Sequence, residues 1–334
     1  MEKGKILFLY NAVADAKKRG YFPQLMSFSQ IDVFSEALNN TGYQVVPLNL
    51  HNPEQLRDFV RTKGPFSIAF CIAEGFLDLP VSLADGSGAA RVRRVLDDLG
   101  VEATHSTAST MEVCWHKDQT YQALRRFGIL TPRYFVIQPG KGLLEQQLQS
   151  IEQEMTFPLF VKPAVGGTSV GISERSLVST PWELAVQVYT LLKEFKNLPI
   201  KEFKNLPILV ETYLAGREYT VGVMGNREKL VLPIIAFPLS QKIRTTTAKK
   251  MGSKSGREII SVGDSRYQQL SELAIGVFDA VGAQDVLRID IREDCEGNPA
   301  VIDVNGNPAM TPSASLAQMA AWAGFPTIIL WSYF

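Results

Sequence analysis

Strand-like and helix-like segments alternate through the first third of the chain. Continuous apolar runs typical of buried strands occupy Lys5–Tyr10, Tyr43–Leu48 and Phe66–Ile72. Helix-like segments follow these runs, at Ser29–Thr41, Pro53–Lys63 and Ala89–Leu99. Gly42 and Gly100 stand where the first and last of these helices should stop. Because such alternation is typical of a parallel sheet covered by helices, residues 1–110 are predicted to form a small α/β domain.

The pattern changes after residue 110. Helical periodicity marks Asp118–Phe127, Leu143–Glu154 and Pro181–Glu194, and strand-like runs occupy Arg133–Ile137 and Leu159–Lys162. We therefore predict a second domain, of α+β type, over residues 111–190. The remaining residues, 191–334, are predicted to form a third domain.

An octapeptide is repeated without change near the start of the third predicted domain. Lys193–Ile200 has the sequence KEFKNLPI, and Lys201–Ile208 repeats it. The period is too short for a solenoid. The second copy leads into the strand-like run Ile208–Tyr213, so the first copy only lengthens the preceding loop, which costs little free energy. We interpret the repeat as a neutral duplication or a sequence artefact rather than a functional insertion.

Charge, cysteine usage and hydropathy argue against several classes of protein. The chain has 34 Lys and Arg against 34 Asp and Glu, a balance that argues against broad nucleic-acid binding. Its three cysteines are far apart and form no CxxC pair, which fits a reducing cytoplasm and argues against structural zinc. No apolar run is long enough to cross a bilayer, and the start is a poor signal peptide. We therefore expect a cytoplasmic protein without nucleic-acid or membrane partners.

Two strand-like runs near the C-terminus carry oxygen-bearing side chains. Leu287–Ile291 includes Asp290, and Ala300–Asn305 includes Asp303 and Asn305. Alternate residues of a strand point to one face, so Asp303 and Asn305 share a face and a hairpin can bring Asp290 beside them. Three such oxygen ligands suit Mg²⁺, with Mn²⁺ as a substitute. The alternative is a hairpin whose polar residues face water.

A glycine-rich loop follows the strand-like run that ends at Lys162. From Phe160 to Ile172 it reads FVKPAVGGTSVGI and includes the hydroxyls of Thr168 and Ser169. Glycines let backbone N–H groups approach phosphate closely, and Lys162 would supply a positive charge. The segment lacks the GK[ST] sequence of a P-loop. The alternative is an ordinary hairpin turn.

Residues 208–223 form two strand-like runs around a bend, with Glu211 and Glu218 at its edges. One interpretation is a plain hairpin with solvated acids. The other is a nucleotide-binding hinge, in which backbone groups near Tyr213 and Leu214 pair with adenine and a carboxylate accepts hydrogen bonds from the ribose.

Residues 241–254 carry five basic side chains, including Lys249, among threonines, serine and glycine. Without an apolar period, this segment is predicted to be a mobile loop. Its basic residues are either simply solvated or form a lid that closes over phosphates.

Taken in order, these motifs resemble the ATP-grasp enzymes and, among them, the D-alanine–D-alanine ligases. The matching residues are VKP at 161–163 with TSVG at 168–171, VE and GRE within 210–218, and RID, DVN and MTP within 288–312. The resemblance extends from about residue 65 onward. It implies a three-domain ATP-grasp fold of α/β and α+β type, whose N-terminal domain is Rossmann-like. It also implies dependence on ATP and Mg²⁺, and a homodimer, because the family is commonly dimeric.

The resemblance assigns a role to each matched residue. The residues that would bind the nucleotide are Lys117, Lys162, Glu211, Tyr213, Leu214 and Glu218. The metal ligands would be Asp290, Asp303 and Asn305. The residues that would act on the reacting groups are Arg288, Thr168, Ser169 and, in the basic lid, Lys249. Arg288 corresponds to the arginine that faces the acyl phosphate and the tetrahedral intermediate.

The sequence departs from the ligases at the amino-acid pockets. The ligases carry an acidic residue after the first strand, and here Gln30 or Asp32 could occupy its place. Cys71–Phe76 replaces the family's His-Gly loop, Ala309 replaces a glycine of the oxyanion hole, and Ser313–Leu316 stands at the site of the second substrate's carboxylate. The nucleotide and metal positions are kept. We therefore expect ATP activation to be retained and substrate choice to differ.

These observations support one leading hypothesis and two alternatives. The leading hypothesis is an ATP- and Mg²⁺-dependent C–N ligase that joins an amino acid's amine to a phosphate-activated acid or carbonyl in a specialised metabolite pathway, such as mycosporine-like amino acid synthesis. The first alternative is a D-alanine–D-alanine ligase of cell-wall synthesis. The alternative of another class is a non-catalytic nucleotide-binding protein, which the intact set of Lys162, Asp290, Asp303 and Asn305 disfavours.

Overall fold

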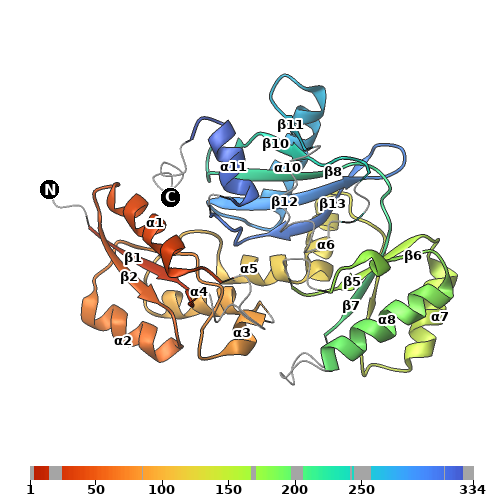
Figure 1. The fold of residues 1–334 in the computed structure, drawn as a ribbon, viewed down its shortest axis with the longest axis horizontal. Coiled ribbons are helices and arrows are strands. Elements are labelled where there is room, and N and C mark those ends of the chain that lie inside the picture. The colour runs from red at the N-terminus through yellow and green to blue at the C-terminus, as the bar shows by residue number, and fades with distance from the viewer. Residues whose placement is uncertain are drawn as a thin grey trace.

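The computed structural model describes residues 4–14, 25–84, 86–166, 171–196, 206–240, 243, 257–311 and 313–325. The strands of these residues form three sheets. In Figure 1 the N-terminal sheet lies at the left, a four-stranded sheet at the right and the largest sheet at the top. No helix in the described ranges is both long and apolar enough to span a membrane.

The N-terminal sheet is parallel, as the alternation of strands and helices predicts. Its strand order is β2-β1-β3, and its strands are β1 (Lys5–Tyr10), β2 (Gln44–Asn49) and β3 (Ile68–Cys71). Alternate residues of β1 enter two different cores. Ile6 and Phe8 pack with α1 (Phe28–Asn39), whereas Leu7 and Leu9 pack with α2 (Pro53–Lys63) and α4 (Gly88–Asp98). This two-sided burial explains the continuous apolar run of the strand.

The four-stranded sheet is antiparallel and has helices on one face. Its order is β4-β7-β5-β6, and its strands are β4 (Tyr134–Ile137), β5 (Leu159–Pro163), β6 (Leu177–Val178) and β7 (Ile208–Thr212). The helices α7 (Leu144–Glu154) and α8 (Pro181–Lys196) share a hydrophobic core with this sheet. A short 3-10 helix, Glu174–Ser176, precedes β6. The opposite face of the sheet is therefore left for other contacts.

The largest sheet has the strand order β11-β10-β8-β12-β13, with β9 paired to β8. Its strands are β8 (Glu218–Met224), β9 (Leu230–Val231), β10 (Ile234–Ala236), β11 (Glu258–Ile260), β12 (Val286–Glu293) and β13 (Pro299–Asn305). The helix α10 (Ser265–Ala280) covers one face, and α11 (Ser315–Trp322) shares a core with the other face and with α1. Mixed α/β and α+β architecture is therefore confirmed.

Three further helices are α3 (Pro80–Ala84), α5 (Ala108–Trp115) and α6 (Lys117–Arg126); α5 and α6 lie in the middle of the molecule, and α3 packs against α4 (Figure 1). A polar junction also joins the N-terminal part to the largest sheet. The backbone N–H of His105 donates to Asp285 Oδ2 at 2.8 Å, and the Asn226 side chain donates to Asp285 Oδ1 at 2.7 Å. Both His105 and Asp285 have a positive φ, of 71° and 59°. Such a backbone conformation is held only where surrounding contacts fix it.

The boundary predicted at residue 190/191 does not follow the elements. It falls inside α8, and β7, which was assigned to the third domain, pairs with β4 and β5 of the second. One of the two interpretations of residues 208–223, a plain hairpin, would pair β7 with β8, but the two strands lie in different sheets. We propose that the second domain continues through β7 and that the third begins at β8.

Candidate active site

The hairpin of β12 and β13 places its polar residues on one face of the largest sheet. Asp290 lies directly opposite Asp303, and Arg288 lies opposite Asn305. Their neighbours Ile289 and Val304 point to the other face, into the core with α10. Alternation along the two strands therefore brings all four polar side chains together.

Hydrogen bonds and charge orient the acidic residues of this hairpin. Asp290 is 6% exposed, and its Oδ1 accepts a hydrogen bond from Thr220 Oγ1 at 2.7 Å. Arg288 lies 3.5 Å from Asp290 Oδ2, and its buried Nε makes no hydrogen bond to the described residues. Asp303 Oδ1 lies 3.5 Å from Lys117 Nζ. A buried guanidinium nitrogen without an acceptor among the described residues, beside the Asp290 carboxylate, is a group that a further anion could pair with.

The hairpin's oxygen atoms fit a magnesium ion. Two facing carboxylates and the amide of Asn305 are the ligand types that Mg²⁺ takes, with its remaining positions left for water and phosphate oxygens. Within the described ranges no three His, Cys, Asp or Glu side chains gather as a metal site. Because the third donor is an amide, the set is poor for zinc and suited to a hard cation.

Lys117 joins this hairpin to the glycine-rich segment. It is the first residue of α6, and its backbone N–H donates to Ala164 O at 2.9 Å. Its ammonium donates to Gly166 O at 2.6 Å and faces Asp303. The contacts hold the start of α6 against the end of the segment that follows β5. Sequence patterns alone did not predict this contact; only the family resemblance assigned Lys117 and the glycine-rich segment to the same site.

Lys162 and Glu211 form a buried ion pair on the free face of the four-stranded sheet. They are diagonal neighbours on β5 and β7, and Lys162 Nζ lies 2.7 Å from Glu211 Oε1. Lys162 also donates to Ile302 O at 3.1 Å, which ties this sheet to β13. With side chains only 5% and 6% exposed, the pair is shielded from water and its interaction is correspondingly strong.

Tyr121 completes this network, and sequence reasoning missed it. It is fully buried, and its hydroxyl lies 2.8 Å from Glu211 Oε2 and 2.9 Å from Ile302 O. Burial and the Glu211 carboxylate raise the pKa of Tyr121 well above its usual value, so the hydroxyl remains a hydrogen-bond donor. Its position four residues after Lys117 puts both on one face of α6, which is the signal that could have found it.

Glu218 lies in a second charged group at the bend. Arg292, directly opposite on β12, places NH1 3.3 Å from Glu218 Oε2. The Arg292 guanidinium stacks on the Tyr213 ring at 5.0 Å and donates to its hydroxyl at 3.0 Å. The Tyr213 N–H donates to Pro158 O, whereas the backbone of Leu214 makes no hydrogen bond to the described residues. Leu214 therefore offers backbone groups to a ligand.

Cys114 lies beside the hairpin but does not behave as a nucleophile. Burial, with a smaller effect of Asp303, raises the pKa of the Cys114 thiol to about 12. A thiol that stays protonated is a poor nucleophile. The described chemistry of the site is therefore that of lysines, arginine and carboxylates.

The structure places the predicted site residues in three groups: Arg288, Asp290, Asp303 and Asn305 with Lys117; Lys162 with Glu211; and Glu218 with Tyr213 around Arg292, with Leu214 next to Tyr213 in the chain. Thr168, Ser169 and Lys249 lie outside the described residues, as do most of the basic segment and of the repeated octapeptide.

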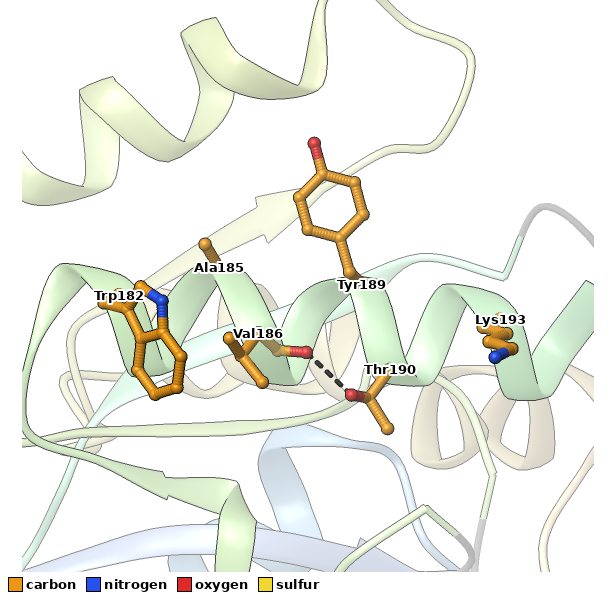
Figure 2. Close-up of a pocket in the computed structure, with 6 residues that line it drawn as sticks. All are labelled: Trp182, Ala185, Val186, Tyr189, Thr190 and Lys193. Carbon is orange, nitrogen blue, oxygen red and sulfur yellow. Dashed lines mark hydrogen bonds between the residues drawn. The ribbon is translucent and has the colours of Figure 1, made fainter.

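A surface hollow of about 350 Å³ lies elsewhere, along α8 (Figure 2). It is lined by Trp182, Ala185, Val186, Tyr189, Thr190 and Lys193. None of these belongs to the site.

The expected substitutes for the family's acidic residue do not reach the site. Gln30 caps its own helix, because its Oε1 accepts a hydrogen bond from the Ser27 N–H at 2.9 Å. Asp32 is exposed on α1. Burial, with a smaller effect of the Asp32 carboxylate, raises the pKa of Tyr10. Neither residue takes the place that the sequence comparison suggested.

Comparison with known proteins identifies the family. A family model described as D-ala D-ala ligase C-terminus matches residues 123–330, more than half of the chain. A D-alanine–D-alanine ligase of Haemophilus influenzae is 28% identical over 301 residues, which cover 90% of this chain and 91% of the relative.

Solved structures show the same fold. A Bacillus anthracis D-alanine–D-alanine ligase complexed with ATP has a TM-score of 0.71 and 20% identity, covering 99% of this chain and 95% of that one. The VanG D-Ala:D-Ser ligase of Enterococcus faecalis has a TM-score of 0.73 and 16% identity, covering 99% and 98%. The chain therefore belongs to the D-ala D-ala ligase family of ATP-grasp proteins and is an ATP- and Mg²⁺-dependent ligase.

Proposed function

We propose that the chain is a D-amino-acid ligase that forms a D-alanyl dipeptide, with D-alanine as the activated substrate. The observation that carries this proposal is the hairpin face on which Asp290, Asp303, Asn305 and Arg288 meet Lys117. The curated relatives, which are D-alanine–D-alanine ligases, support the choice of substrate. They favour the first alternative over the specialised metabolite pathway, which has no support among them.

ATP would lie between the two antiparallel sheets. The Leu214 backbone and the Glu211 carboxylate would receive the adenine, and Glu218 would accept hydrogen bonds from the ribose hydroxyls. Lys162 and Lys117 would then neutralise phosphate oxygens. The two lysines now face Glu211 and Asp303, so phosphate would take over contacts that these carboxylates make in its absence.

The reacting groups would lie over the hairpin. A carboxylate oxygen of the first amino acid attacks the γ-phosphorus of ATP, and ADP leaves. The amine of the second amino acid then attacks the acyl phosphate, and phosphate leaves as the peptide bond forms. Arg288 stabilises the oxyanion of the tetrahedral intermediate. Asp290, Asp303 and Asn305 would hold Mg²⁺, which supplies charge neutralisation at the β- and γ-phosphates.

The proposal is tested by following ADP, phosphate and dipeptide when the protein is incubated with ATP, Mg²⁺ and D-alanine. We expect the three products in equal amounts, loss of all three with chelator, and recovery with Mg²⁺ or Mn²⁺. Asp303→Asn should lower turnover at least 100-fold. Asp279→Asn, the same change at an exposed surface pair, should not. If no panel of amino acids stimulates ADP release, the protein is a nucleotide-binding protein and the proposal fails.

We also propose that the enzyme works in the cytoplasm as a homodimer. The sparse cysteines without a CxxC pair support the first statement, and the family resemblance supports the second, since its members are commonly dimeric. Light scattering of the purified protein would show twice the mass of the chain if the second statement holds.

A further inference from the structure

A half-buried carboxylate that the proposed mechanism does not use lies at the edge of the site. Glu74 follows β3 at the carboxyl end of the parallel sheet, the edge at which open α/β sheets bind ligands. Its side chain accepts a hydrogen bond from the Asn307 side chain. The Asn307 backbone N–H in turn donates to Asn305 Oδ1 at 2.9 Å. Glu74 is therefore connected through one residue to the proposed metal ligands.

The backbone of Glu74 is held rigidly. Asn11, which follows β1 and is 4% exposed, accepts hydrogen bonds from the N–H groups of Glu74 and Gly75 at 2.8 and 3.1 Å. Its amide donates to Leu50 O and Gly75 O at 3.0 and 3.1 Å. On the other side, a Cβ added to Gly88 would lie 2.3 Å from Glu74 O. Such support is what a binding residue needs, because it fixes the carboxylate before the ligand arrives.

The Glu74 carboxylate has no cation in contact with it in the described part of the chain. Arg93 is the charged group that acts on it, but Arg93 donates its hydrogen bonds elsewhere, to the carbonyls of Ala89, Cys71, Thr104 and Ser106 and to Cys71 Sγ. Burial raises the pKa of Glu74 to about 7, against the opposing effects of Arg93 and Asn307. A half-buried carboxylate without a close cation has lost part of its hydration without a compensating charge, and a cationic ligand would supply that charge.

We propose that Glu74 binds the ammonium group of the amino acid whose carboxylate is activated, an inference that rests on the proposed function. In an α-amino acid the ammonium and the carboxylate are one carbon apart, so the ammonium must be bound close to the phosphoryl-transfer site. Glu74 meets this requirement through Asn307 and Asn305. Gln30 does not meet this requirement because its side chain caps α1, and Asp32 does not because it is exposed on α1.

The test uses hydroxylamine in place of the second amino acid, so that only the activated substrate is varied. The purified enzyme converts D-alanine, ATP and hydroxylamine to the hydroxamate, and propionate serves as the matched substrate without the ammonium. In Glu74→Gln we expect the KM for D-alanine to rise roughly 30-fold or more while the rate with propionate and the KM for ATP stay within about threefold. Glu74→Asp keeps the charge and should retain the preference for D-alanine.

The variant is expected to fold. Burial raises the pKa of Glu74 from its ordinary value of 4.5 to about 7 in the folded state, so its contribution to stability is present at low pH and is lost as the pH rises through about 7. Glu74→Gln should therefore be at least as heat-stable as the parent at pH 8.

Four outcomes would overturn the inference. Glu74→Gln could leave the preference for D-alanine unchanged, or lower the use of D-alanine and propionate equally, as a purely structural role would. Asp32→Asn, rather than Glu74→Gln, could remove the preference. If the parent enzyme makes no hydroxamate from any amino acid, the proposed function fails together with this inference. An active parent with an unaffected Glu74→Gln variant rejects only the role of Glu74.

Discussion

The Tyr121 hydroxyl links the two ends of the proposed nucleotide site. One hydroxyl lies within hydrogen-bond distance of a carboxylate on β7 and a carbonyl on β13, and Lys162 donates to it at 3.3 Å. These groups belong to three elements of two sheets. A single buried donor thus sets the spacing between Glu211, proposed to bind adenine, and Ile302, the neighbour of Asp303.

Removing this hydroxyl should weaken ATP binding. Tyr121→Phe leaves Glu211 Oε2 without its buried donor, at a cost of about 1–2 kcal/mol, and the KM for ATP is expected to rise roughly 5- to 30-fold. The KM for the amino acid should change much less. Tyr134→Phe is the matched control, since the Tyr134 hydroxyl makes one long bond, of 3.3 Å, to Asp118 O. An equal effect of both substitutions, measured by steady-state kinetics, would contradict the role given to Tyr121.

At the scale of elements, the start of α1 explains why a plausible sequence match does not reach the site. Ser27 and Gln30 form a reciprocal capping box, in which each side chain binds the other's backbone N–H. The side-chain oxygen of Gln30 therefore serves as the hydrogen-bond acceptor of the Ser27 N–H at the start of α1.

Gln30→Ala should therefore act on stability and not on substrate choice. We expect a loss of about 0.5–1 kcal/mol in the free energy of unfolding and no more than a twofold change in the KM for either substrate. Denaturant titration and steady-state kinetics measure the two effects on the same preparation. A tenfold rise in the KM for the amino acid would show that Gln30 does reach the substrate.

Elements with a strong local pattern could be predicted from the sequence, and those defined by distant partners could not. The hairpin of β12 and β13 was predicted because its period-2 pattern and turn are local. The helix α10 also has a local pattern, with apolar residues at Leu270, Ala274 and Val277 and an Asp264 cap, although no helix was predicted there. The pairing of β7 with β4 and β5 depends on strands more than 40 residues away, which no local pattern encodes.

At the scale of the whole molecule, the proposed site lies where the largest sheet, the four-stranded sheet and α6 meet. The hairpin supplies the carboxylates, the four-stranded sheet supplies Lys162 and Glu211, and α6 supplies Lys117 between them (Figure 1). The core of the N-terminal sheet continues into that of the largest sheet, where Phe8 and Phe34 belong to the same cluster as Met319. The sequence predicted the hairpin, Lys162, Glu211 and Lys117 as parts of the site. It did not predict a role for Glu74, whose surroundings come from three separate segments.

The central claim is that the chain activates a carboxylate by transferring the γ-phosphoryl group of ATP to it. The most direct measurement uses D-alanine labelled with ¹⁸O in its carboxylate, together with ATP and Mg²⁺, and mass analysis of the nucleotide and phosphate products. Attack on the γ-phosphorus followed by departure of phosphate moves one labelled oxygen into phosphate for each peptide bond formed. We predict labelled phosphate, unlabelled ADP and no AMP. Label in AMP, or unlabelled phosphate released alongside dipeptide, would contradict the account.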